Sequence, residues 1–185
     1  SGAGTVVLNY GIGDKDNGSG FDFSGLTGEA ELRGGRIELN ASTFGADCPD
    51  FRLTTGDSQL VFAGSGTHVG SNVILDADTT IHVNTESSGT LAGVISGNGA
   101  FNKAGAGVLT FAAVNTYTGV TNIGGGRIVL ASGGDYTLFN NVTSGNLEVA
   151  EGTTLVNNGK QLTSTLTLAA GSAAEMNGER TLKGA

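Results

Sequence analysis

The chain has 185 residues, of which 33 are glycine and one is proline, and its formal net charge is −8. Average glycine usage is about 7%, and each glycine costs a helix about 1 kcal/mol relative to alanine, so a helical bundle is excluded. The acidic balance opposes binding to nucleic acid or to an anionic membrane surface, and an apolar share of 38% argues against a wholly disordered chain. An all-β chain with many turns remains.

Short apolar segments recur along the chain between clusters of Gly, Asn, Asp and Ser. In chain order, the segments that predict strands are residues 5–8, 36–39, 59–62, 72–75, 80–83, 108–111, 127–130, 146–149 and 166–168. Several alternate apolar and polar side chains, as Leu147, Glu148 and Val149 do, which is typical of half-buried strands. No window carries the apolar stripe of an amphipathic helix.

Apolar residues also repeat over a longer distance. Leu60, Ile81 and Phe101 follow one another at nearly even intervals, and so do Ile128, Leu147 and Leu166, whereas the step from Phe101 to Ile128 is longer. This spacing predicts an all-β fold, a right-handed parallel β-helix with about 20 residues per coil and about eight or nine coils, forming one continuous domain over residues 1–185. A β-sandwich is the competing fold, but no Asn-Gly turn lies cleanly between two long alternating strands.

The charge is unevenly distributed along the chain. Residues 1–92 hold four basic and twelve acidic groups, a net charge of −8, whereas residues 93–185 hold five of each. We therefore expect an acidic half that makes contacts with partners and a neutral half that serves as scaffold. No run of 18 apolar residues predicts a membrane-spanning helix, so we expect no direct membrane insertion. The chain starts and stops within its strand pattern, and we interpret it as a piece of a longer protein.

Residues 89–130 contain the most ordered motif in the sequence. A glycine-rich turn leads into Lys-x-Gly-x-Gly, then into Leu-Thr, Asn-Thr-Tyr-x-Gly and Thr-x-Ile. The residues that occupy these places are Lys103, Gly105, Gly107, Leu109, Thr110, Asn115, Thr116, Tyr117, Gly119, Thr121 and Ile123. This segment resembles the passenger-associated transport repeat, or autotransporter-associated β-strand repeat, of bacterial autotransporters. Phe101 and Ala113 depart from it, standing where the repeat more often has Leu and Gly.

The resemblance implies a setting for the whole chain. It implies a passenger domain displayed on the bacterial cell surface or secreted, exported by type V secretion through the C-terminal outer-membrane β-barrel of the parent chain. In a β-coil, Gly105 and Gly107 are expected to turn a corner, and Asn115 to satisfy its own backbone while Tyr117 packs. Leu109, Phe111 and Ile123 are expected to face the interior.

Two patterns with possible chemistry have plainer explanations. Gly56-Asp57-Ser58-Gln59-Leu60 is similar to the nucleophile block of lipase-type esterases, but a triad needs a histidine base held by a carboxylate, and His68 and His82 do not lie in such a block. Residues 14–22 have the look of a calcium loop, yet Gly18 stands where a ligand is required. We interpret the first as a chance match and the second as a solvated acidic turn.

A pair of carboxylates leaves one enzymatic alternative open. Asp76 and Asp78 lie on one face of an extended segment, as in β-helical polysaccharide lyases, where basic groups from adjacent coils would have to complete the site. Cys48 is the chain's one cysteine, so it has no partner for an intrachain disulfide. We therefore predict no catalytic, cofactor-binding or metal-binding residues and no cofactor.

The favoured function is non-enzymatic. We predict an adhesin or self-association rod, which is also an export-linked folding scaffold and a contributor to virulence. Its partners would be a host surface molecule or another copy of itself, and not nucleic acid. The alternative is a β-helical polysaccharide-active protein, either a lyase or a carbohydrate-binding spike.

Overall fold

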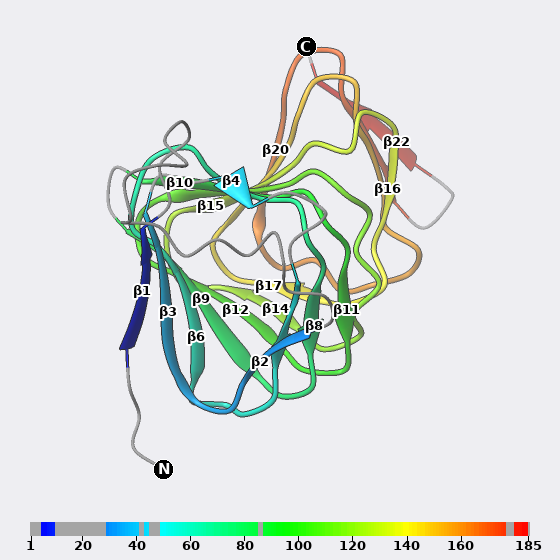
Figure 1. Cartoon of the computed structure of the whole chain (residues 1–185). Coiled ribbons are helices and arrows are strands. Elements are labelled where there is room, and N and C mark those ends of the chain that lie inside the picture. The colour runs from blue at the N-terminus through cyan, green and yellow to red at the C-terminus, as the bar shows by residue number, and fades with distance from the viewer. Residues whose placement is uncertain are drawn as a thin grey trace.

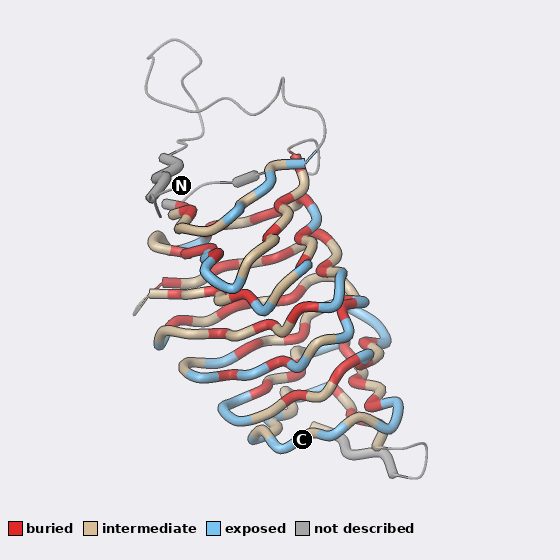
Figure 2. The backbone as a smooth tube through the Cα atoms, turned by 90° about the horizontal axis from the view of Figure 1, so that it is seen from below, coloured by how far each residue is buried: buried red, intermediate tan, exposed pale blue. Residues whose placement is uncertain are grey.

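The chain folds as a parallel β-solenoid. The computed structural model describes residues 5–9, 29–40, 43–44, 49–84, 87–176 and 180–184, and none of these is helical. The solenoid makes about 6 turns, with strands about 21 residues apart. Figure 2 shows the coils stacked on one another from the N-terminal to the C-terminal end, with buried residues recurring along each coil. The parallel β-helix predicted from the repeat spacing is confirmed.

The described residues form four sheets, which line the sides of the stack (Figure 1). Sheet A consists of β1 (Thr5–Asn9), β3 (Gly35–Asn40), β6 (Ser58–Phe62), β9 (Thr79–Val83), β12 (Phe101–Ala104), β14 (Thr121–Ile123) and β17 (Val142–Thr143). Sheet C consists of β4 (Thr43–Phe44), β7 (Thr67–Val69), β10 (Ser88–Leu91), β13 (Val108–Phe111), β15 (Arg127–Leu130), β18 (Asn146–Val149) and β20 (Thr165–Leu168).

The third side of the stack is divided between two smaller sheets. Sheet B consists of β2 (Glu29–Leu32), β5 (Asp50–Leu53), β8 (Val73–Leu75) and β11 (Ile95–Gly97). Sheet D consists of β16 (Asp135–Thr137), β19 (Thr154–Val156), β21 (Ala173–Met176) and β22 (Arg180–Lys183). Every pairing between the named strands is parallel except that of β21 with β22.

All nine predicted segments coincide with strands, but the predicted eight or nine coils are too many. The pairing of β1 with β3 sets Thr5 opposite Arg36, so the first step of sheet A is longer than one repeat. At the other end, β22 turns back antiparallel on β21 and does not begin another coil. The repeat length was therefore right, and its extension over the whole chain was wrong.

The register explains why the two apolar series are out of step with each other. Leu60 pairs with Ile81 in sheet A, but the next residue in that column is Lys103, because Phe101 pairs with Thr79. The second series belongs to sheet C, where Ile128, Leu147 and Leu166 pair one after another. The two series thus mark two sides of the coil, and each side keeps its own spacing.

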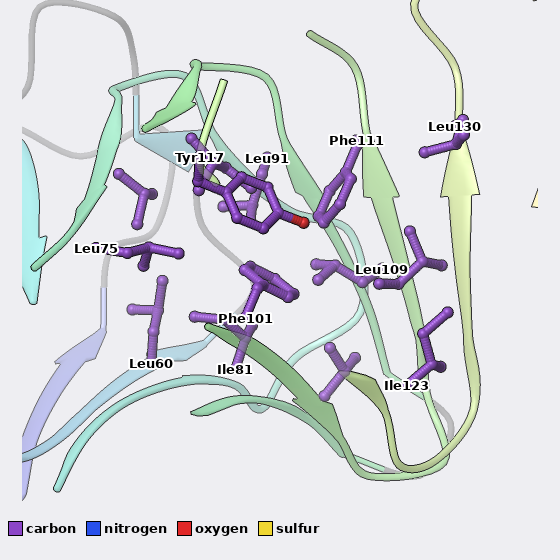
Figure 3. Packing of buried hydrophobic residues seen from close by; sticks show 14 of the residues in the cluster. Leu60, Leu75, Ile81, Leu91, Phe101, Leu109, Phe111, Tyr117, Ile123 and Leu130 are labelled. Carbon is purple, nitrogen blue, oxygen red and sulfur yellow. The ribbon is translucent and has the colours of Figure 1, made fainter. Parts of the chain in front are cut away.

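The core runs along the inside of the stack and is filled by apolar side chains from all the sheets. Figure 3 shows a part of it that contains residues of sheets A, B and C. Phe101 meets Phe111 edge to face, with 5.2 Å between the ring centroids, and lies 5.8 Å from the ring of Tyr117. Gly89 occupies an inward position of sheet C, where a Cβ atom would overlap the ring of Phe62. Because Gly89 has no side chain, the ring of Phe62 from sheet A fills the space beside it.

Candidate functional site

The segment with the ordered motif spans two coils in the middle of the stack. Its strands β12 and β14 belong to sheet A, and β10, β13 and β15 belong to sheet C. Leu109, Phe111 and Ile123 are 0–2% exposed, as predicted for interior residues. Gly105 has φ +75° and a Cβ there would overlap the backbone of the preceding coil, so the corner requires glycine.

Lys103 lies inside the core at a position where its neighbours are isoleucines. It pairs with Ile81 on one side and with Ile123 on the other, and it is 1% exposed. Its ammonium nitrogen donates hydrogen bonds to the carbonyl oxygens of Ala104 (2.9 Å), Gly105 (2.8 Å) and Gly125 (3.0 Å). Since Gly125 belongs to the next coil, the lysine ties two successive coils together at their corner.

The electrostatics of Lys103 are those of a charge solvated by backbone. No carboxylate contacts the ammonium among the described residues; its hydrogen-bond acceptors are the three carbonyl dipoles. Burial lowers the pKa of Lys103 to about 8, because a charged form is disfavoured where water is excluded. A fully buried lysine without an acidic partner is rare in proteins.

Asn115 lies where the third side of the stack passes from sheet B to sheet D. Residues 112–120 contain no strand, and β11 and β16 lie on either side of them. The Asn115 side-chain oxygen accepts a hydrogen bond from the Ile95 amide (2.8 Å), and its amide nitrogen donates to the Tyr136 hydroxyl (2.8 Å). The expectation that Asn115 satisfies its own backbone was wrong: its side chain bridges the preceding and the following coil.

Further buried polar side chains surround this junction. The Tyr117 hydroxyl contacts Thr121 Oγ1, and the Asn140 amide nitrogen donates to the same oxygen (2.6 Å) and to the Gly119 carbonyl (2.9 Å). Burial raises the pKa of Tyr117 to about 12, and it raises the pKa of Tyr136 well above its ordinary value. Tyr117 packs in the core as predicted (Figure 3), but it is also part of a polar group there.

The carboxylate pair proposed for an enzyme is divided between two structural tasks. Arg52 from the adjacent coil does reach Asp76, with 2.6 Å between Nε and Oδ2, and it also pairs with Glu29. Asp78 instead accepts a hydrogen bond from the Ala100 backbone amide (2.9 Å). The lyase interpretation requires a basic group, and Arg52 is present, but its guanidinium is already engaged in the ion pair with Asp76.

The esterase-like block has no triad geometry. Ser58 is fully buried, and its hydroxyl donates to the Leu32 carbonyl (2.9 Å) and accepts from the Gly34 amide (3.2 Å). His68 lies on β7 of sheet C and His82 on β9 of sheet A, so the two histidines are on different sides of the coil. The serine therefore fixes a turn, and neither histidine contacts it.

Some sequence predictions fall outside the described residues. These are the acidic turn at residues 14–22 and the thiol of Cys48. Within the described ranges, no three His, Cys, Asp or Glu side chains gather as they would around a metal ion. The same part of the chain has no helix whose length and apolarity would suit a membrane crossing.

Residues 101–130 match the family model described as the passenger-associated-transport-repeat. The chain carries a passenger transport repeat. This confirms the resemblance inferred from residues 89–130, and the repeat together with the β-solenoid fits an autotransporter passenger. Comparisons with curated proteins and with solved structures found no match.

Within the transport repeat, sequence reasoning missed the buried positions of Lys103 and Asn115. Polar residues are expected at the surface on composition alone. The one signal in the sequence was spacing: Lys103 follows Ile81 by one repeat, at the position where an apolar residue was due. Tyr136 and Asn140 lie beyond the matched residues and carried no signal of their own.

Proposed function

We propose that this chain is a non-enzymatic segment of an autotransporter passenger, in which the transport repeat holds successive coils in register as the rod folds. The observation that carries the proposal is the side chain of Asn115, which bonds to Ile95 in one coil and to Tyr136 in another. The repeat further supports linkage to a C-terminal outer-membrane β-barrel, and display on the cell surface or secretion.

Register is a physical problem for a stack of short strands. A slip of one residue exchanges the inner and outer faces of a strand, and strands as short as β11 and β16 have only three residues each with which to resist it. Buried hydrogen bonds are satisfied only in the correct register, because a misplaced amide would be left without partners. Asn115 and Lys103 together impose this condition at two corners of the repeat.

The test compares Asn115→Ala with Asn98→Ala in the full-length parent protein. Asn98 is an exposed residue one coil earlier, so it controls for the loss of an asparagine. We expect Asn115→Ala to slow refolding of the segment and to reduce the amount of folded, protease-resistant passenger on cells, and Asn98→Ala to do neither. Equal refolding rates and equal display of both variants would refute the register role.

A second candidate function is adhesion or self-association along the outer face of sheet A. Outward polar side chains align there from coil to coil; in register they are Gln59, Thr80, Asn102, Asn122 and Thr143. Such a ladder offers many weak hydrogen bonds to a host surface molecule or to a second copy. The acidic half of the chain, residues 1–92, is the other region that we propose for partner contacts.

The ladder is tested by charge. Asn102→Glu combined with Asn122→Glu places like charges on neighbouring coils of both copies, so self-association through this face should fall. Cells that display the parent protein would be scored for aggregation and for attachment to host cells. Unchanged aggregation and attachment, with normal display, would exclude this face.

A further inference from the structure

A small cavity lies beside the polar group of the transport repeat. Its walls include Tyr117, Thr121, Tyr136 and Asn140, and apolar side chains such as Ile128 and Leu147 complete it. The space open to a water-sized sphere is about 10 Å³, which is about what one water molecule requires. The cavity is therefore polar on one side and too small for a larger ligand.

The hydroxyl groups around the cavity have more protons than acceptors. The Tyr136 oxygen accepts from Asn115, but no described residue accepts the proton of that hydroxyl. Tyr117 and Thr121 share one hydrogen bond, which uses one of their two protons, and Asn140 donates to this pair as well. Two hydroxyl protons are thus left over, from side chains that are only 2–3% exposed.

We propose that one water molecule is bound in this cavity as a structural part of the repeat. It accepts one hydrogen bond from Tyr136 and one from the free hydroxyl proton of the Tyr117–Thr121 pair, and it donates one to the side-chain oxygen of Asn140, which lines the same cavity. Buried polar groups are almost always satisfied, and buried waters make about three hydrogen bonds each. The water connects the strand-free segment 112–120 with β16, alongside the direct bond from Asn115 to Tyr136.

A crystal structure of the unmodified chain, at a resolution that shows ordered water, tests the proposal directly. We expect a density peak within about 2.6–3.2 Å of the Tyr136 hydroxyl and of either Tyr117 or Thr121. In solution, a long-lived water should give a nuclear Overhauser signal to the methyl groups of Ile128 and Leu147. A cavity without density, or methyl groups without this signal, would overturn the proposal.

A double-mutant cycle tests whether the two sides share the water. Tyr136→Phe and Thr121→Val each remove one hydroxyl, and no direct hydrogen bond joins these two residues. We expect the double variant to lose less in denaturation midpoint than the sum of the single losses, because either change already weakens the shared water. Tyr136→Phe with Ser58→Ala is the distant control and should be additive; additivity in the test pair would show that no water links the two groups.

Discussion

Replacing Lys103 with methionine measures how strongly one buried ammonium ties two coils together. Methionine is unbranched and apolar, so it fits a column whose neighbours are Ile81 and Ile123. The substitution removes three hydrogen bonds of 2.8–3.0 Å to backbone carbonyls. It also removes the cost of burying a charge, so the sign of the result depends on which effect is larger.

The magnitudes favour destabilisation. Hydrogen bonds to charged groups contribute about 1.5–3 kcal/mol each, so three of them exceed roughly 4 kcal/mol. Burial lowers the pKa of Lys103 from 10.5 to about 8, which corresponds to a charge-burial cost of at most about 3 kcal/mol, less whatever solvent at the corner screens. We expect a net loss of at least about 1 kcal/mol, or at least about 2–4 °C in melting temperature for a chain of this size.

The assay is thermal and guanidinium denaturation at pH 7, followed by circular dichroism. Lys160→Met is the matched control, since Lys160 lies in a surface turn and its side chain makes no hydrogen bond or ion pair to any described residue. It should leave the midpoint nearly unchanged. A Lys103→Met variant as stable as the unmodified chain, or more stable, would refute the reasoning, because the core column would then prefer an apolar residue to a carbonyl-bound ammonium.

Three further changes have expected outcomes. Between pH 8 and 10.5 the unfolded chain keeps the proton that folded Lys103 loses, so the free energy of unfolding should rise with pH. Above pH 10 the unfolded tyrosines lose protons that folded Tyr117 retains up to about pH 12, so the free energy of unfolding should fall. Melting temperatures measured across this pH range should therefore pass through a maximum, and the rise below the maximum should be lost in Lys103→Met. Gly89→Ala should cost about 1–3 kcal/mol by overlap with Phe62; in chemical denaturation, Phe62→Leu should restore part of the loss, and Gly56→Ala should cost less. Arg52→Gln breaks an exposed ion pair with Asp76 and should shift the midpoint less than Lys103→Met does, with the difference from the unmodified chain vanishing in 1 M salt.

The sequence predicted strands well where apolar residues alternate and poorly where they do not. Segments such as 108–111 and 127–130 were found at their observed bounds. The strand Ser88–Leu91 was missed because Gly89 stands at its inward position, and its role depends on Phe62 from another sheet. Strand β2 was missed because two of its four residues are glutamates. These segments are strands because they pair with the neighbouring coil, and their local sequence does not indicate that pairing.

The same contrast explains what was missed at the repeat. The motif could be recognised from the order of its residues, and its glycines and apolar positions could be given roles, because each depends on local geometry. Lys103 and Asn115 act on partners one coil away along the chain, namely Gly125, Ile95 and Tyr136. Nothing within one coil distinguishes such a residue from a surface polar residue. Only the register shows which side chains meet.

The placement of these two residues suggests what buried polar side chains contribute to the stacking of the coils. An apolar column resists a slip of one residue, which exchanges the inner and outer faces of a strand, but after a slip of two residues apolar side chains meet apolar side chains again. A lysine that needs three carbonyls and an asparagine that needs both an amide and a phenol do not tolerate it. Either side chain would lower the stability if it were buried without its hydrogen-bond partners, and those partners are in place in only one alignment of the coils. Buried polar residues of this kind would therefore select one register between successive coils, where apolar packing alone would allow more than one.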